Sequence, residues 1–245
     1  MKMLRRKRAV APPSTLPGER IYAVGDIHGR LDLLDAMLDR IETDVAKHPS
    51  TICTLVFLGD YVDRGPDSAL VLQRLIDSQR AYRTVCLKGN HEALLSAFLT
   101  DGGVLQDWGA LGGFNTLMSY GLSPLIQSSA SQRTALSSQL RKHMPESHLL
   151  FLDHLPLHYV SGDYVFVHAG IRPKRRLVDQ LESDLLWIRD DFNLYEGRHE
   201  KFVVHGHTPV LAPDIRSNRI NIDTGAYATG RLTCLVLEDA ERRFL

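Results

Sequence analysis

The chain has 245 residues, of which 44% are hydrophobic, so it is long enough to bury a sizeable core within one domain. Lysine plus arginine equals aspartate plus glutamate, at 29 residues each, and this balance excludes a general attraction to nucleic acid or to an anionic bilayer. No apolar run approaches the roughly 18 residues needed to span a membrane. We therefore expect a cytoplasmic protein without a nucleic-acid partner or a stable membrane association.

The first 18 residues are basic and contain several prolines, and they lack the apolar core of a signal peptide. Because proline, serine and charge resist packing, residues 1–18 are predicted to form a disordered basic leader and residues 19–245 a single domain. A contact of the leader with a membrane or with nucleic acid is the alternative. The three cysteines, Cys53, Cys86 and Cys234, lie in or beside apolar runs without CxxC spacing, which indicates reduced core residues.

Five short apolar runs, rich in valine and aromatic residues, end on a glycine, a histidine or both. Runs of this kind predict strands that are buried on both faces. They cover residues 21–29, 55–60, 85–92, 164–170 and 202–208. Each run carries, at or beside its end, polar groups that could hold a metal ion.

The segments between these runs have a different period. Leucine and isoleucine recur at helical spacing between the first three runs, which predicts a β-α-β-α-β opening and an α/β fold with ligand sites at the carboxyl ends of its strands. Residues 93–155 are leucine-rich and mostly helical, with glycine breaks, and we interpret them as an inserted helical cap. Short apolar pieces at Ile215 and at residues 219–222 and 232–237 predict antiparallel strands.

The polar residues at the predicted strand ends have the chemistry of metal ligands. Asp26 and His28 are two residues apart, so an extended chain presents both side chains on one side. Imidazole suits zinc, iron and similar ions, and carboxylate accepts manganese or magnesium. An isolated Asp-X-His is more often a turn with a capping aspartate. The later strand ends add four further candidates, namely Asp60, Asn90, His168 and His207. Six such side chains serve two ions better than one.

Five motifs occur along the chain in the order GDIHG, GDYVDRG, KGNHE, HAG and GHT. This ordered set resembles the signature of the phosphoprotein phosphatase family of calcineurin-like metallophosphoesterases, and the match covers residues 22–226. Within that family the chain looks like a member of the bacterial serine/threonine protein phosphatase group, whose relatives include the symmetrical diadenosine tetraphosphatases. The resemblance implies an α/β fold of the αββα type, in which two mixed sheets are flanked by helices.

The resemblance also implies a role for each candidate ligand. In the pattern of the family, the first of two divalent ions is held by Asp26 and His28, both ions by Asp60, and the second by Asn90, His168 and His207. A water between two such ions loses a proton near neutral pH, so a metal-bridging hydroxide is the expected nucleophile. Manganese is the expected metal, with iron and zinc as alternatives.

Four further residues match catalytic and substrate-binding positions of the family. His91 would be the general acid that protonates the departing alkoxide, a step that contributes roughly 10²- to 10⁴-fold in rate. Asp63 would orient His91 and raise its pKa. Arg64 would hold the substrate phosphate through two parallel hydrogen bonds, and Arg189 is the candidate for a second phosphate-binding arginine. The alternative for Arg189 is a surface arginine paired with a neighbouring aspartate.

The last motif distinguishes between related activities. Gly206 precedes His207, as a glycine precedes the ligand in family members, so His207 is the predicted ligand and His205 a packing or supporting residue. Many phosphodiesterases and nucleases of the superfamily carry GHxH, in which the final histidine is an additional ligand. Pro209 stands at that position here, and proline cannot ligate through its side chain. The difference favours the phosphatase branch.

These features predict a dinuclear-metal phosphatase that hydrolyses phosphoserine or phosphothreonine in proteins. The alternative is a symmetrical bis(5'-nucleosyl)-tetraphosphatase, in which the basic residues 172–176 would hold the additional phosphates, although a solvated charge run is the simpler interpretation of that segment. A catalytically silent phosphate-binding module is a third hypothesis, but every expected ligand position is filled. The expected partner is a phosphoprotein or a small phosphoester substrate, and the sequence leaves the oligomeric state open.

Overall fold

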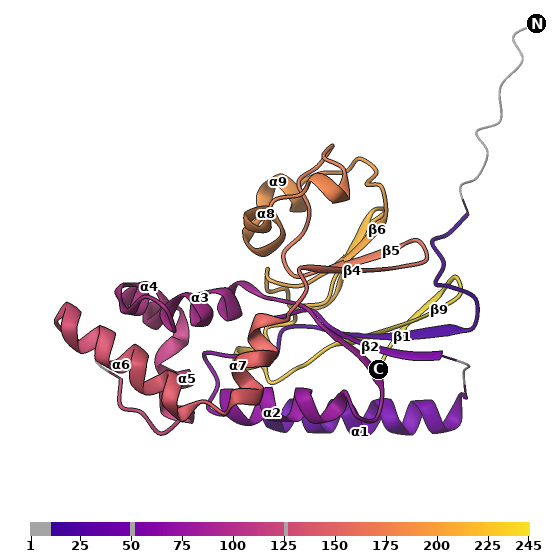
Figure 1. Ribbon diagram of the computed structural model, residues 1–245. Coiled ribbons are helices and arrows are strands. Elements are labelled where there is room, and N and C mark those ends of the chain that lie inside the picture. The colour runs from indigo at the N-terminus through magenta and orange to yellow at the C-terminus, as the bar shows by residue number, and fades with distance from the viewer. Residues whose placement is uncertain (1–10, 50–51, 125–126) are drawn as a thin grey trace, which may run out of the picture.

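Two five-stranded sheets pack face to face, and helices cover the outer face of each (Figure 1). This computed structural model describes residues 11–49, 52–124 and 127–245. Each sheet combines parallel and antiparallel strands. The predicted αββα sandwich of two mixed sheets flanked by helices is therefore confirmed.

The first sheet contains both the first and the last strand of the described chain. In spatial order its strands are β10 (Glu241–Phe244), β9 (Cys234–Glu238), β1 (Glu19–Val24), β2 (Ile52–Phe57) and β3 (Arg83–Cys86). β1, β2 and β3 are parallel, as the predicted β-α-β-α-β opening requires, and β9 runs antiparallel to β1. The carboxyl ends of β1, β2 and β3 consequently lie at the same edge of the sheet.

The second sheet is built from the later part of the chain. In spatial order its strands are β4 (His158–Ser161), β5 (Tyr164–Val167), β6 (Phe202–His205), β8 (Arg219–Asn221) and β7 (Asp214–Ile215). β7 and β9 have the antiparallel neighbours that were predicted, whereas β8 also pairs in parallel with β6. The difference arises because β7 reverses the chain after β6, so β8 runs again in the direction of β6.

Helices form the outer layers and one lateral extension. The long helices α1 (Leu31–Lys47) and α2 (Ser68–Ser78) cover the first sheet, and α8 (Glu182–Trp187) and α9 (Asp190–Asn193) cover the second (Figure 1). The segment between β3 and β4 contains α3 (Asn90–Phe98), η1 (Gly102–Val104), α4 (Leu105–Trp108), η2 (Gly109–Gly113), α5 (Phe114–Ser119), α6 (Ala130–His143) and α7 (Glu146–Asp153). The remaining short helices are η3 (Leu177–Asp179) and α10 (Ala226–Thr229). The segment predicted as a cap is helical and extends to one side of the sheets, and its status as an insertion stays a prediction.

Alternate residues of the central strands enter different layers of the core. On β1, Ile21 and Ala23 pack between the two sheets, whereas Tyr22 and Val24 pack on the side of α1 and α2. β5 divides its residues in the same way between the inter-sheet layer and the layer beneath α8 and α9. Burial on both faces explains why these runs are continuously apolar in the sequence.

The predicted leader can be compared with the structure only in part, because residues 1–10 lie outside the described residues. Beyond them, the Thr15 N–H donates to Asp239 O at 3.0 Å, and the Asp163 N–H donates to Ser14 O at 2.8 Å. These bonds attach residues 14 and 15 to the turns between β9 and β10 and between β4 and β5. This portion therefore differs from the disordered segment that was predicted, because backbone hydrogen bonds hold it to both sheets. The boundary at residue 19 stays a prediction.

All three cysteines are free thiols in the first sheet. Cys86 and Cys234 are buried and Cys53 is half-buried, in agreement with their prediction as core residues. Within the described ranges, no helix combines the length and the apolar character needed to cross a bilayer.

Ile220 and Ile215 provide a matched test of the layer between the sheets. They lie opposite each other in the β7–β8 pair, but Ile220 is fully buried between the sheets and Ile215 is 55% exposed. Ile220→Ala should lower the free energy of unfolding by about 2–5 kcal/mol, because it leaves a cavity. Ile215→Ala should lower it by less than about 1 kcal/mol. Urea unfolding followed by circular dichroism measures both values, and equal losses would contradict the difference in burial between the two residues.

Candidate dinuclear metal site

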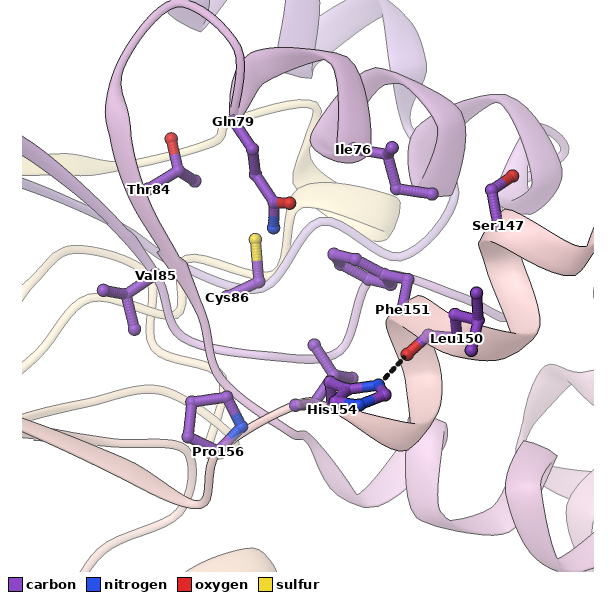
Figure 2. Close-up of a pocket in the computed structure, with 11 residues that line it drawn as sticks. Ile76, Gln79, Thr84, Val85, Cys86, Ser147, Leu150, Phe151, His154 and Pro156 are labelled. Atoms are coloured by element: carbon purple, nitrogen blue, oxygen red, sulfur yellow. Dashed lines mark hydrogen bonds between the residues drawn. The ribbon is translucent and has the colours of Figure 1, made fainter.

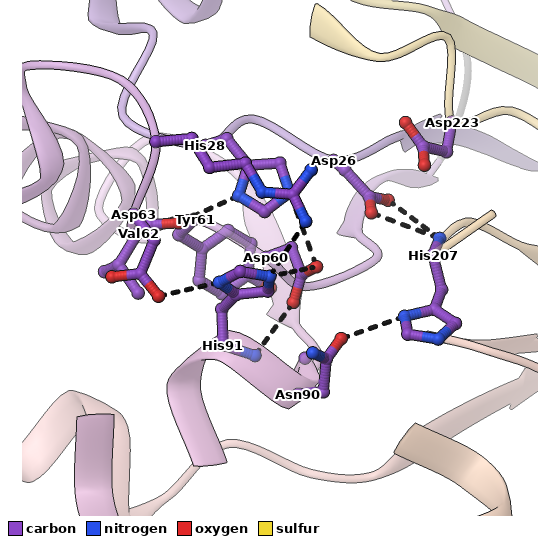
Figure 3. Close-up of polar contacts among 12 residues, drawn as sticks. Asp26, His28, Asp60, Tyr61, Val62, Asp63, Asn90, His91, His207 and Asp223 are labelled. Atoms are coloured by element: carbon purple, nitrogen blue, oxygen red, sulfur yellow. Dashed lines mark hydrogen bonds and ion pairs between the residues drawn. The ribbon is translucent and has the colours of Figure 1, made fainter. Parts of the chain in front are cut away.

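The ends of five strands place the predicted metal ligands in one cluster, and Figure 3 labels all of them except His168. The segments that follow β1, β2, β3, β5 and β6 supply, in that order, Asp26 with His28, Asp60, Asn90, His168 and His207. Each of these side chains belongs to a residue that is no more than 5% exposed. The structure thus brings together all six residues that were predicted to bind metal.

Backbone carbonyls orient two of the histidine rings. The Nδ1 of His28 lies 2.9 Å from Val62 O, and the Nδ1 of His168 lies 2.9 Å from Leu58 O. Because a carbonyl oxygen only accepts hydrogen bonds, each neutral ring carries its proton on Nδ1 and turns an unprotonated Nε2 toward the cluster. Metal-binding histidines have this arrangement, in which the second ring nitrogen is held by a carbonyl or a carboxylate.

Three side chains bring potential metal-ligand atoms close together. The Nε2 of His168 lies 2.9 Å from the Oδ1 of Asn90, and the Nδ1 of His207 lies 2.9 Å from the same oxygen and 3.2 Å from His168 Nε2. Because His168 carries its proton on the other nitrogen, no hydrogen lies between it and the Asn90 oxygen. Lone pairs that converge in this way repel one another unless a cation lies among them. This donor set therefore fits a metal ion.

Asp60 belongs to two groups of potential ligand atoms. One group consists of His28, Asp60 and His91, the other of Asp60, His168 and His207, and within each the atoms lie within 4.8 Å of one another. A carboxylate has two oxygens and can contact two ions, as the predicted bridging role of Asp60 requires. The first group contains His91 where the prediction has Asp26. The Asp26 carboxylate instead lies beside this group and accepts the backbone N–H of His207 at 3.1 Å.

The cluster concentrates buried negative charge among neutral histidines. Burial, reinforced by the nearby carboxylates of Asp223 and Asp60, raises the pKa of Asp26 well above its usual value. Burial also acts to raise the pKa of Asp60, but interactions with the surrounding histidines outweigh it and hold that pKa below its usual value. Burial lowers the pKa of His28 to about 3 and that of His207 to about 2, so both rings are neutral and able to ligate. Divalent cations would offset the charge of the carboxylates.

The loop after β2 has a strained backbone. Asp60, Asp63 and Arg64 have φ angles of 54°, 72° and 67°, in a left-handed region that costs a residue other than glycine roughly 1–3 kcal/mol. Glu92 holds the first part of this loop, because its carboxylate accepts the backbone N–H groups of Asp60 at 2.8 Å and Tyr61 at 2.7 Å. Strain that the surrounding structure maintains is typical of functional sites.

His91 and Asp63 form a buried pair beside the candidate ligands. The Nδ1 of His91 lies 2.7 Å from the Oδ2 of Asp63, and its Nε2 lies 3.4 Å from Nη2 of Arg64. Burial lowers the pKa of His91, but Asp60 and Asp63 raise it by more, so the net shift of this pKa is upward. The three residues predicted for catalysis and phosphate binding in this loop and helix are therefore adjacent.

Arg189, the candidate for a second phosphate-binding arginine, lies at the cavity that the candidate metal ligands line. It lines the same cavity as Arg64, and its Nη1 is 3.5 Å from the Oγ1 of Thr208. Asp191, one of the aspartates considered as a surface partner for Arg189, pairs with Arg172 at 2.9 Å. The position of Arg189 thus agrees with a role toward substrate.

The basic run at residues 172–176 is neutralised within its own surroundings. Arg172 contacts Asp184 at 2.7 Å and Asp191 at 2.9 Å, and Arg175 contacts Asp184 at 2.9 Å. Neither arginine lines the cavity at the candidate metal site. The structure therefore supports the interpretation of a paired surface run rather than a grip for additional phosphates.

His205 points away from the cluster. Its ring packs against Phe192 of α9 with 4.9 Å between ring centroids, and the residue is fully buried. This placement agrees with the packing role predicted for His205. Pro209 also lines the cavity.

Interpretation of the sequence missed several residues that surround the cluster. Asp223 is buried and lines the cavity. It lies between the end of β8 and Gly225, and this sequence of strand, acid and glycine could have indicated it. Tyr227, which was left out of the predicted site, places its ring 5.3 Å from that of His28 and 4.4 Å from Cζ of Arg64. No comparable pattern marks Tyr227.

Two cavities of different size and lining lie in this region of the fold. The one at the candidate metal site has a volume of about 50 Å³ and is rimmed by the partly exposed Leu111 and Trp187. A larger cavity of about 540 Å³ lies between α2, β3 and α7, and its lining includes Gln79, Cys86 and Phe151 (Figure 2). The two share no lining residue. The chemistry belongs to the small cavity, because the convergent carboxylates, imidazoles and arginines line that one.

A sandwich of two mixed sheets with aspartate, histidine and asparagine gathered at its strand ends defines a metal-dependent phosphoesterase. The sequence pattern of the family described as calcineurin-like phosphoesterase matches residues 19–235, and the chain belongs to this family. The family uses divalent metal ions, in keeping with the two groups of potential ligands that share Asp60.

Curated relatives and solved structures resemble the chain over most of its length. A bis(5'-nucleosyl)-tetraphosphatase PrpE, named as asymmetrical, from Oceanobacillus iheyensis is 26% identical over 244 residues, which cover 91% of this chain and 90% of the relative. The protein of the same name from Anoxybacillus flavithermus is 28% identical, with 89% and 90% covered. A solved structure described as a "putative diadenosine tetraphosphatase" has a TM-score of 0.63 and 22% identity, covers 96% of this chain and 98% of its own, and shares the fold.

His207 and His205 allow a matched test of the metal site. His207→Gln should reduce the number of bound manganese ions from two to one, because it removes a ligand from the group that contains Asp60 and His168. His205→Gln should leave two ions bound, because that ring packs against Phe192. Metal content after loading and gel filtration measures both. Loss of an ion from the His205 variant alone would contradict this assignment of the two histidines.

Proposed function

We propose that this protein is a metal-dependent phosphatase that hydrolyses phosphate monoesters with alkoxide leaving groups, such as phosphoserine and phosphothreonine in proteins. The observation that carries the proposal is the buried pair of His91 and Asp63 beside the cavity at which the candidate ligands converge. An alkoxide is a strongly basic leaving group, so its departure requires a proton donor at that place.

The two arginines would bind the phosphate oxygens. A guanidinium group is planar and can donate two parallel hydrogen bonds to a phosphate, which fixes the direction of the bond to be broken. The guanidinium group of Arg64 packs on the Tyr227 ring in a cation–π contact, with 4.4 Å between Cζ and the ring centroid. Arg189 lines the cavity beside His207 and Trp187, so the phosphate would lie between the two arginines and the metal ligands.

The ligand cluster would hold two divalent ions. The side chains proposed for this role are Asp26, His28, Asp60, Asn90, His168 and His207, and we propose manganese as the metal, although iron and zinc accept the same ligand types. When bound, such ions supply a water of lowered pKa as the nucleophile and stabilise charge on the phosphoryl oxygens. The protein itself contributes neutral imidazoles of defined tautomer, fixed by the carbonyls of Val62 and Leu58.

His91 would complete the reaction by moving one proton. Asp63 accepts the hydrogen on Nδ1, which turns Nε2 toward the cavity. The proton on Nε2 passes to the oxygen of the departing alcohol as the bond from that oxygen to phosphorus breaks. The ring then remains neutral and still bonded to Asp63. The upward shift of the His91 pKa favours the protonated form that this step requires.

A second candidate function is the asymmetrical cleavage of a dinucleoside tetraphosphate. Two observations favour it: the curated relatives are named for this activity, and Trp187 and Tyr227, 43% and 38% exposed, lie at the candidate site where a nucleobase could stack. The alternative formed from the sequence was symmetrical cleavage, which breaks a different bond of the same chain of phosphates. The relatives support the asymmetrical reaction instead.

A direct comparison of substrates tests the proposal. The manganese-loaded protein should hydrolyse a phosphoserine peptide with a kcat/KM at least about 10-fold above that for diadenosine tetraphosphate, because only the alkoxide requires full protonation. Phosphate release and nucleotide chromatography measure the two rates. The reverse preference, with ATP and AMP as products, would replace the proposal by the second candidate, and hydrolysis of neither substrate would revive the phosphate-binding module.

Replacement of His91 tests the origin of the preference. His91→Asn should lower kcat for phenyl phosphate by roughly 10²- to 10⁴-fold and that for p-nitrophenyl phosphate by less than about 10-fold, because p-nitrophenolate leaves without a proton. His154→Asn, in the larger cavity, is the matched control and should change neither rate. Equal losses on both substrates would contradict a role of His91 as the general acid.

A further inference from the structure

Asp63 receives hydrogen bonds from residues far along the chain. Its Oδ2 accepts the indole N–H of Trp108 at 2.8 Å in addition to His91 Nδ1, and its Oδ1 accepts the hydroxyl of Thr116 at 2.6 Å. Trp108 and Thr116 lie 45 and 53 positions after Asp63, in the helical segment that follows α3. All four residues are almost completely buried. The carboxylate that orients His91 is thus held mainly by a different part of the fold.

The same helical segment also holds the backbone of residues 63 and 64. The Asp63 N–H lies 2.9 Å from the Thr116 Oγ1, and the Arg64 N–H donates to Gly112 O at 3.2 Å. Asn115 donates through its side-chain amide to the Arg64 carbonyl oxygen. Both Asp63 and Arg64 have left-handed φ angles, which are unfavourable for these residues and need such external support.

Two glycines in this segment leave room for the contacts with residues 63 and 64. A Cβ on Gly113 would approach Trp108 ring atoms to 2.4 Å, and a Cβ on Gly112 would approach the Arg64 backbone nitrogen to 2.7 Å. Gly112 also has a φ angle of 109°, which a side chain would strain. The turn at residues 108–116 is therefore shaped to fit closely against residues 63 and 64.

We propose that Trp108 and Thr116 are positioning residues for proton transfer, which hold the Asp63 carboxylate in the one orientation that directs His91 Nε2 at the leaving group. The inference rests on the proposed role of His91. The carboxylate has two oxygens and can rotate about its bond to Cβ. With Oδ1 anchored by Thr116 and Oδ2 shared by Trp108 and His91, rotation would break strong bonds to a buried charge. The leaving-group proton would then be delivered from a fixed point.

This role differs from general support of the fold in what it predicts for different substrates. Replacing a residue that only stabilises the fold reduces the fraction of active protein. Such a replacement therefore lowers the rates for all substrates by the same factor. A residue that acts through His91 affects substrates in proportion to their need for a proton. The effect must also vanish when His91 itself has been replaced, because the two changes then remove the same step.

Thr116→Val provides the cleanest test, because it removes the hydroxyl and nearly preserves the volume. In the manganese-loaded protein it should lower kcat for phenyl phosphate by about 10-fold or more, with KM unchanged and kcat for p-nitrophenyl phosphate within about 3-fold of wild type. Thr116→Ser, which keeps the hydroxyl, should restore most of the rate. Thr134→Val is the matched control, because its exposed hydroxyl donates to Ala130 O within α6 and to no other residue of the described chain.

The same measurements in the His91→Asn background separate the possible failures. Thr116→Val should cause no further selective loss there, and Trp108→Phe should behave as Thr116→Val does in both backgrounds. If His91→Asn shows the selective loss but Thr116→Val and Trp108→Phe do not, this inference is wrong and the proposed general acid stands. If His91→Asn shows no selectivity, the proposed function fails first. An additional equal loss in the His91→Asn background would indicate a purely structural role.

Discussion

The candidate site depends on the burial of several carboxylates at one end of two packed sheets. Asp26, Asp60 and Asp223 are each no more than 2% exposed, and Glu92 is fully buried beside them. Burial of an ionised carboxylate is costly unless hydrogen bonds or cations compensate it. Glu92 is compensated by four backbone N–H groups of the loop after β2 and the start of α3. The aspartates lack so complete a shell, and the lowered pKa values of His28 and His207 mean that these rings supply no positive charge. Divalent ions are the natural compensation.

The strained loop after β2 follows from the same constraint. In the proposed site, one residue of this loop contacts two ions, a second contacts a histidine and a third contacts the substrate phosphate. A chain that leaves a buried strand must turn at once to place three neighbouring side chains in this way. Asp60, Asp63 and Arg64 turn the chain sharply with left-handed conformations, in keeping with the roles proposed for them. The loop keeps this shape because Glu92 binds its first half and the turn at residues 108–116 binds its second half. Rigid positioning of the reacting groups is thereby secured by contacts outside the loop itself.

Much of this arrangement was predictable because it depends on local sequence. Continuous apolar runs identified the strands, and their polar ends identified Asp26, Asp60 and His168, since parallel strands present their carboxyl ends at a common edge. The direction of β8 was not predictable, because it depends on the reversal at β7. The contacts of Trp108 and Thr116 with Asp63 were not predictable either. They join positions about 50 residues apart and depend on how the helical segment packs, which no periodicity records.

The residues proposed for the reaction and the residues at the rim of the cavity come from different parts of this fold. The candidate ligands, His91 and the candidate phosphate-binding Arg64 lie at strand ends and in the segments attached to them, and these segments carry the recognisable motifs. The rim comes from two other segments, which contribute Leu111 and Trp187 with Arg189, and Tyr227 contacts the His28 ring from a third. A general acid acts on the oxygen that leaves phosphorus, whereas an aromatic rim acts on groups several bonds away. The buried His91–Asp63 pair is held in one arrangement by two additional donors, Trp108 and Thr116, which come from outside the loop.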